Sequence, residues 1–371
     1  MAKLNEGDVI EGIFALALSE IFAYGKIDKQ RLNKARTKIE PEMFKDGRYE
    51  VVIRDELGGG RGFQTNSFPP DIFVVKLILR LKPASVEGAY GKKYNVLFKS
   101  SKDIGNIDSK IDSMIKHAKG FRDKLLRIRD KFLKNNRTDK VLFEIYADGI
   151  AGETSGGKIK ADIDLRIFAN GKKQSDIHIP YSLKSGSKTL SNLSPYKGLM
   201  AMMDKFGLEY VHEEEFASNL GPGGALERAK TPAQKKKKVQ MLTDMYDGFI
   251  EGMDKEGRGS AAFTKTAFEI ISEAAFGDDF ATVVDLDKST VKFMDPKYTD
   301  ELLKSALKNR RYAKAGIIGS GDNRKLAVYF DDINKNENHL FTYRKKFRVS
   351  GSGSMELKLY VEAGKMIYSK M

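Results

Sequence analysis

Apolar residues along the chain follow two spacings, one typical of helices and one typical of strands. Intervals of three and four predict helices over residues 6–24, 106–134, 193–206, 239–253, 261–275 and 298–308. Alternating or short apolar runs predict strands over residues 49–54, 71–81, 94–99, 141–146, 158–168, 176–184, 325–330, 340–349 and 356–368. The chain is therefore predicted to be α/β (mixed α+β), with helices flanking a core sheet and a basic, β-rich C-terminal region.

Two of the predicted strands, 158–168 and 176–184, are separated by a hairpin signal, Asn170-Gly171. Each strand has one apolar and one polar face. The polar positions are Lys158, Lys160, Asp162, Asp164 and Arg166, then Asp176, His178, Pro180, Ser182 and Lys184. In an antiparallel hairpin the numbers of directly opposed residues have a constant sum. A strict two-residue loop pairs residue 169 with residue 172, so this sum is 341. Because 341 is odd, Asp162 and Asp164 would share a face with Ile177 and Ile179. We predict a three- or five-residue loop, or a glycine bulge, because each brings Asp162 and Lys184 to one face.

The composition narrows the class of protein. A formal net charge of +14 attracts polyanions and is typical of nucleic-acid binding, although a basic but otherwise ordinary soluble protein stays an alternative. The absence of cysteine excludes disulfides, thiolate zinc sites and cysteine nucleophiles. No apolar run approaches the roughly 18–20 residues of a membrane span, so we expect no membrane partner and a cytoplasmic location.

The hairpin carries a set of residues suited to cutting phosphodiester bonds. Carboxylates hold Mg²⁺, which neutralises phosphate charge, and a lysine orients the attacking water. Asp162 begins an alternating strand, and Ser182-Leu183-Lys184 ends the next, followed by Gly186 and a helix. This pattern, within residues 140–206, resembles the core of the PD-(D/E)XK nuclease superfamily. The resemblance implies a restriction-endonuclease-like core sheet and DNA cleavage with Mg²⁺ or Mn²⁺. Asp162 would ligate the metal and Lys184 would orient the water.

One position departs from the family pattern: Ser182 stands where an acid usually precedes the lysine by two residues. Some members of the superfamily take the missing carboxylate from a neighbouring element, and Ser182 would then position the metal shell or the phosphate. Candidates here are Glu144, Glu153 and, as a further ligand, Asp164. We favour Glu144, because its strand should pack beside the hairpin. Without such a carboxylate the site would bind DNA without cutting it, and the two aspartates could equally be solvent-facing strand residues.

The same order of motifs, with Gly149–Gly152, Lys160-Ala161-Asp162 and Ser182–Ser187, also resembles a group of uncharacterised bacteriophage proteins. That resemblance implies a viral origin and the host cytoplasm as location. We divide the chain into a nuclease-like domain (1–208), a linker or mobile loop (209–238) and a C-terminal helical and β-rich nucleic-acid-binding region (239–371).

Two basic segments are candidates for nucleic-acid binding. The residues concerned are Lys235 and Lys236, then Arg344, Lys345, Lys346 and Arg348. The second segment lies near aromatic residues, a mixture typical of single-strand binding. A solvated basic stretch and an ordinary strand with a basic outer face are the respective alternatives. DNA is the predicted partner, with RNA and a homodimer left open. The rival function is that of a non-catalytic nucleic-acid-binding or virion-associated protein.

Overall fold

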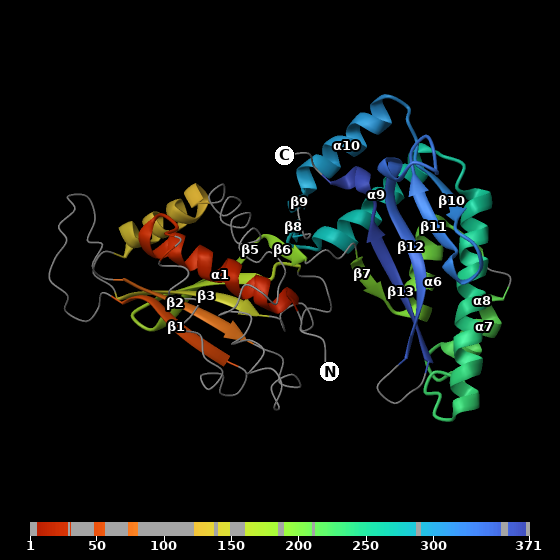
Figure 1. Cartoon of the computed structure of the whole chain (residues 1–371), viewed down its shortest axis with the longest axis horizontal. Coiled ribbons are helices and arrows are strands. Elements are labelled where there is room, and N and C mark those ends of the chain that lie inside the picture. The colour runs from red at the N-terminus through yellow and green to blue at the C-terminus, as the bar shows by residue number, and fades with distance from the viewer. Residues whose placement is uncertain are drawn as a thin grey trace. The chain divides into compact units, whose positions relative to one another are not determined.

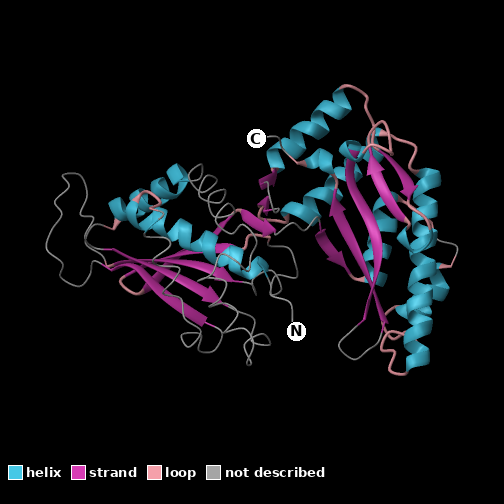
Figure 2. Ribbon diagram, in the orientation of Figure 1, coloured by secondary structure: helices cyan, strands magenta, loops and turns pink. Residues whose placement is uncertain are grey.

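The structure, a computed structural model, describes residues 6–28, 30, 48–55, 73–80, 122–136, 140–148, 160–184, 189–209, 212–286, 291–349 and 355–368. Helices and several β-sheets make up the fold, which confirms the mixed α/β class (Figure 2). No helix in this part of the chain is long and apolar enough to cross a membrane.

The chain forms two compact units. Unit 1 comprises Met1–Ser187 and Gly277–Lys292, and unit 2 comprises Lys188–Phe276 and Phe293–Met371. The chain therefore leaves unit 1 and later returns to it, which differs from the sequential domains predicted above. Local sequence patterns do not contain this information, because the return depends on pairing between distant strands.

Unit 1 is built on a five-stranded sheet with the order β1-β2-β3-β4-β5. The strands are β1 (Arg48–Asp55), β2 (Phe73–Arg80), β3 (Val141–Asp148), β4 (Ile163–Ala169) and β5 (Lys172–Ile179). β2 and β3 are parallel, and the other neighbours are antiparallel. The predicted strand 94–99 and the first part of the predicted helix 106–134 lie outside the described residues.

One face of this sheet is covered by helix α1 (Glu6–Tyr24), which contacts β2 and β3 (Figure 1). The helical residues 122–135 contribute to the same core. Phe143 of β3 lies at its centre, with the rings of Phe22, Phe73 and Phe132 at centroid distances of 4.7, 5.8 and 6.0 Å. This apolar layer fixes the face of the sheet, so the opposite, polar face of β3 and β4 is available for charged residues.

The β4–β5 hairpin turns at Asn170 and Gly171, whose φ values of 48° and 77° suit a tight two-residue turn. Near the turn the paired residue numbers sum to 341, as in Ala169 with Lys172. A bulge between Ile167 and Phe168 then shifts the sum to 342, as in Ile163 with Ile179. The predicted shift in pairing, from an odd to an even sum of residue numbers, is confirmed. It arises from a bulge inside the strands beside a plain two-residue loop, and not from a longer loop or a glycine.

The second predicted strand of the hairpin breaks at Pro180. Residues beyond it form β6 (Tyr181–Lys184), which pairs in parallel with β8 (Thr282–Leu286). These two strands and β9 (Val291–Met294) form a three-stranded sheet with the order β6-β8-β9. Proline has no N–H to continue the ladder with β4, whereas its carbonyl accepts a hydrogen bond from the Thr282 N–H at 2.8 Å. The break therefore directs Lys184 into a different sheet from β4, the strand that follows Asp162.

Unit 2 contains the second five-stranded sheet, order β10-β11-β12-β13-β7, which is antiparallel throughout. Its strands are β7 (Thr189–Leu193), β10 (Lys314–Ile318), β11 (Lys325–Tyr329), β12 (His339–Val349) and β13 (Met355–Ala363). Helix α8 (Pro232–Glu256) packs on it, and the ring of Tyr246 in the helix stacks on that of Tyr343 in β12 at a centroid distance of 6.1 Å. The predicted β-rich C-terminal region is confirmed.

The helices of unit 2 surround this sheet (Figure 1). They are α6 (Pro195–Phe206), α7 (Glu213–Leu220), α8 (Pro232–Glu256), α9 (Ala261–Ile271) continued by η3 (Ser272–Phe276), and α10 (Pro296–Lys308). Three short 3₁₀ turns are η4 (Gly321–Asn323), η5 (Asn336–Asn338) and η6 (Lys365–Ile367). The segment predicted as a linker contains α7 and the start of α8. Thr231 and Gln234 form a capping box that begins α8 immediately before the lysine run.

Candidate functional site

The structure brings Asp162 and the Ser182–Lys184 segment together in unit 1. The Asp162 N–H donates to the Tyr181 carbonyl at 3.0 Å, which extends the hairpin by one hydrogen bond beyond β4. In return, the Asp162 carboxylate accepts the Leu183 N–H at 2.5 Å. Asp162 also accepts a hydrogen bond from the Ser182 side chain. The Asp162 carboxylate therefore meets β6, the strand that contains Lys184, at the end of the hairpin.

Charges of both signs gather around this carboxylate. Burial raises the pKa of Asp162 to about 6, and the positive charge of Lys184 and the two hydrogen bonds from β6 oppose the rise. Burial and the charge of Lys184 also lower the pKa of Lys160, against the opposing influence of Asp279 and Asp162. The pKa values of Lys160 and Asp162 are thus both shifted, and the charges of Lys184 and Asp279 contribute to each shift. Such mutual perturbation is frequent at functional sites, although structural ion pairs show it too.

Asp279 holds the backbone of this site from a distant part of the chain. Its two carboxylate oxygens accept the N–H groups of Lys160 and Ala161 at 3.0 and 2.7 Å. The sequence analysis did not identify Asp279, because an aspartate in a glycine-containing turn has no distinctive local pattern. Its neighbour Phe280 has a φ of 49° and is 67% exposed, which is an unusual conformation for a bulky residue.

Asp285 is a second acid that the sequence analysis did not identify. The parallel pairing of β6 with β8 places it opposite Lys184, and it is only 3% exposed. An apolar strand with one acid predicts a half-buried position at most, so only the strand pairing could have indicated this residue.

Glu144, the favoured source of the missing carboxylate, does not reach Asp162. Its partner across the β3–β4 pair is Arg166, four residues along β4 from Asp162. Four strand residues span about 13 Å, which is too far for two carboxylates to share one ion. The Glu144 carboxylate accepts a hydrogen bond from the Tyr146 hydroxyl at 2.6 Å, and the Arg166 guanidinium lies 3.9 Å from the centroid of the Tyr146 ring. Glu144 is therefore part of a polar network on the sheet face.

Asp164 is also engaged elsewhere. It is 7% exposed, so it is not a solvent-facing strand residue, and its carboxylate lies 2.6 Å from His178 Nδ1. Burial raises the pKa of Asp164, while the hydrogen bond and charge of His178 oppose the rise. Glu153 lies outside the described residues.

The strand register indicates a different neighbour for Asp162. The β3–β4 pairing ends with Ala147 opposite Ile163, and the next pair in the same register is Asp148 with Asp162. Asp148 is the last residue of β3. The sequence analysis predicted this strand only to residue 146 and so did not consider Asp148.

The described residues do not complete a metal site. They contain no group of three or more His, Asp or Glu side chains arranged to hold a metal ion. Asp162 supplies one buried carboxylate, and neither Glu144 nor Asp164 joins it.

The basic residues predicted to bind nucleic acid have different environments in unit 2. Lys345 is 7% exposed, and its Nζ lies 3.1 Å from both Asp247 carboxylate oxygens. Arg344 forms an ion pair with Glu362 at 2.5 Å. Lys345 is thus buried and paired, and the half-buried Arg344 is paired, so both residues are structural in this conformation.

The other basic residues in these two segments differ in exposure. Lys346 and Lys236 are exposed, whereas Lys235 is half-buried. Arg348 lies in β12, but its side chain is outside the described set. Lys346 and Lys236 are therefore accessible to a charged partner.

The chain matches no protein-family model, no curated protein and no solved structure with significant similarity. The resemblance to PD-(D/E)XK nucleases and to bacteriophage proteins therefore stays a prediction.

Proposed function

We propose that unit 1 is a metal-dependent nuclease domain that hydrolyses DNA phosphodiester bonds at Asp162 and Lys184. The observation that carries this proposal is that the Asp162 carboxylate accepts the N–H of Leu183, which is 21 residues further along the chain and directly precedes Lys184. A buried carboxylate near one lysine at the end of a hairpin is the arrangement that the superfamily pattern implies; Lys160 is a second lysine that the pattern does not include.

Each residue around Asp162 would have a distinct role in this reaction. Lys184 and Lys160 place positive charge beside Asp162, where it can stabilise a phosphate and the negative charge that develops on it. Ser182 and the Leu183 N–H orient the Asp162 carboxylate, and Asp279 fixes the backbone that carries it. A divalent cation held by Asp162 would neutralise phosphate charge and activate water. From the backbone register alone, we propose Asp148 as its second ligand in place of Glu144; the Asp148 side chain is outside the described set.

One observation favours the rival function, which is nucleic-acid binding without cleavage. The Asp162 carboxylate already accepts hydrogen bonds from β6, and no complete metal site is present among the described residues. In that case the lysines would bind phosphate and Asp162 would only hold β6 against β4.

Cleavage of supercoiled plasmid separates these functions. The full-length protein is incubated with Mg²⁺, Mn²⁺ or EDTA, beside Asp162→Asn, Lys184→Met and the exposed control Asp278→Asn. We expect metal-dependent nicking that falls on the order of 100-fold or more in the first two variants and is unchanged in the control. Retained binding without nicking by the wild-type protein in any metal would refute the nuclease and support the rival.

Two matched substitutions test which carboxylate is the second metal ligand. We expect Asp148→Asn to abolish nicking and to weaken Mn²⁺ binding measured by calorimetry. Glu144→Gln should leave both close to wild type, because Glu144 lies about 13 Å along the strands from Asp162. The opposite pattern would restore Glu144 as the ligand and contradict the register argument.

A further inference from the structure

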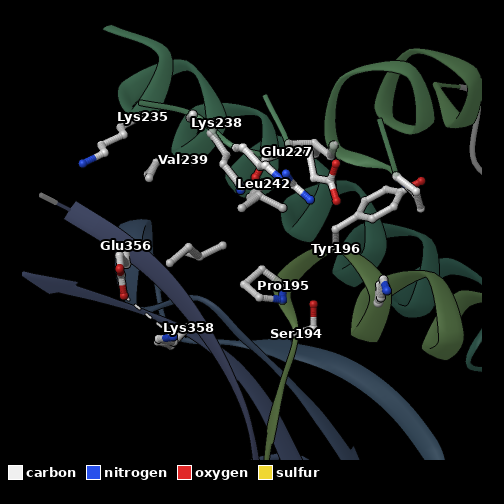
Figure 3. A pocket seen from close by; sticks show the side chains of 16 residues that line it. Ser194, Pro195, Tyr196, Glu227, Lys235, Lys238, Val239, Leu242, Glu356 and Lys358 are labelled. Carbon is white, nitrogen blue, oxygen red and sulfur yellow. Dashed lines mark hydrogen bonds and ion pairs between the residues drawn. The ribbon is translucent and has the colours of Figure 1, made fainter. Parts of the chain in front are cut away.

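Unit 2 contains a cavity of about 420 Å³ that the proposed nuclease site does not use (Figure 3). Four segments form its walls: the start of α6, the turn between α7 and α8, one face of α8 and the start of β13. The volume lies within the roughly 300–1,000 Å³ range of small-molecule sites. All the lining residues belong to unit 2.

The residues of helix α8 that line the cavity change from basic to apolar along the helix. Lys235, Lys238, Val239 and Leu242 line it at the spacings i, i+3, i+4 and i+7, which lie on one helix face. Leu242 is 4% exposed and forms the apolar base together with the equally buried Leu357 of β13. A ligand in this cavity would therefore meet apolar surface at its inner end and lysines towards the mouth.

Positive charge dominates the lining. Five of its residues are basic and two are acidic, a net charge of +3; the basic residues are Lys197, Arg228, Lys235, Lys238 and Lys358. The two acids are already engaged, because Glu227 accepts the Gly223 N–H at 2.9 Å and Glu356 lies 3.7 Å from the Lys358 Nζ. Lys197 and Arg228 are exposed and make no hydrogen bond or ion pair with other described residues. The cavity thus offers two cations for an anionic ligand.

An aromatic ring completes the set. Tyr196, in the first turn of α6, is half-buried and lines one end of the cavity, away from the Glu356–Lys358 pair (Figure 3). Tyrosine rings stack on nucleobases of any sequence. A planar ring, free cations and an apolar base are the three features that a nucleotide requires.

We propose that this cavity binds a nucleoside monophosphate group, either as a free nucleotide or as one residue of a single-stranded nucleic acid. Lys197 and Arg228 would bind the phosphate, Tyr196 would stack on the base, and the leucines would contact the sugar and base edge. The site is separate from Asp162 and Lys184 and does not depend on the nuclease proposal.

Binding is measured in EDTA with the full-length protein, by calorimetry for a deoxynucleoside monophosphate and by fluorescence anisotropy for a labelled single-stranded oligonucleotide. We expect Lys197→Ala and Arg228→Ala each to weaken binding of at least one probe about tenfold. The matched controls are Lys237→Ala and Lys255→Ala, which remove equal charge from exposed positions of α8 outside the cavity. Equal losses in cavity and control variants would mean that only surface charge matters, and would overturn the proposal.

Tyr196 tests whether the base is recognised. Tyr196→Ala should weaken nucleotide binding but not inorganic phosphate binding, and Tyr196→Phe should restore it. If free nucleotide displaces the oligonucleotide, the site binds mononucleotides. If the cavity variants weaken binding of the oligonucleotide alone, the site binds one nucleotide of a single-stranded nucleic acid. No binding of either probe at millimolar concentration would refute the site. Plasmid nicking tests the nuclease proposal separately and needs no nucleotide in the cavity, so failure of that proposal is distinguishable.

Discussion

Asp162 should make unit 1 less stable as the pH rises, and Asp162→Asn should remove that effect. Burial raises the folded-state pKa to about 6, from an ordinary value of 3.8. At about 1.4 kcal/mol per pKa unit, the difference amounts to about 3 kcal/mol. The folded state therefore holds this proton more tightly than the unfolded state. The free energy of unfolding is highest below pH 4, and this group's contribution is lost as the pH rises through 6.

The amide of Asp162→Asn resembles the protonated acid and still accepts the Leu183 N–H through its carbonyl oxygen. We expect the variant to match the wild type at pH 4 and to exceed it by up to about 3 kcal/mol at pH 8. Urea unfolding followed by circular dichroism at several pH values measures the difference. Comparing variant with wild type at each pH removes the general effect of the +14 net charge.

Asp278→Asn, at an exposed position three residues from β8, should show no pH-dependent difference from wild type. A constant difference for Asp162→Asn across the pH range would refute the argument, because the carboxylate would then not be penalised by burial. Mg²⁺ provides a second readout: if Asp162 is a ligand, Mg²⁺ should raise the stability of the wild type at pH 8 and not that of the variant.

Three further substitutions test the packing around the site and in unit 2 by the same unfolding measurement. Asp279→Ala should destabilise unit 1 by about 2–4 kcal/mol, since two backbone N–H groups lose their acceptors; an unchanged midpoint would show that water replaces the carboxylate. Phe280→Gly should raise stability by about 1 kcal/mol, because glycine adopts a φ of 49° without strain and little apolar burial is lost; destabilisation would contradict this. Gly364→Ala should destabilise unit 2 by several kcal/mol, because the new Cβ would lie 2.0 Å from the His339 carbonyl oxygen, and a normal midpoint would show that the backbone shifts freely.

The hairpin and its change of phase were predictable because they are local. Asn170-Gly171 specifies the turn, and the alternation of Asp162 and Asp164 with apolar residues specifies the face. For Asp162 and Lys184 to share a face, the sum of paired residue numbers had to change from odd to even, which needs one extra residue in the hairpin. The bulge supplies that residue. The break at Pro180 was visible in principle, since a proline within a predicted strand argues against continuous pairing.

The partners of Asp162 were harder to predict because they depend on non-local pairing. The alternation of apolar and polar residues put Glu144 on the polar face. It could not show which residue of β4 lies opposite Glu144, because the pairing of β3 with β4 across a long connection sets that. Asp279 and Asp285 join the site only because β8 pairs with β6, about 100 residues earlier in the chain. Lys345 was predicted to be accessible from its basic neighbours, but helix α8 covers its face of the strand and supplies Asp247.

The interrupted path of unit 1 also governs when the candidate site can form during synthesis. Residues 1–187 emerge from the ribosome about 90 residues before Gly277, and β6 has no β8 to pair with until then. At 5–20 residues per second the interval is roughly 5–20 s, during which the Lys160 and Ala161 amides lack the Asp279 carboxylate. A nascent chain released before residue 277 would contain Asp162 and Lys184 without the segment that holds them in place. The fold therefore delays assembly of the candidate site until most of the polypeptide has been made.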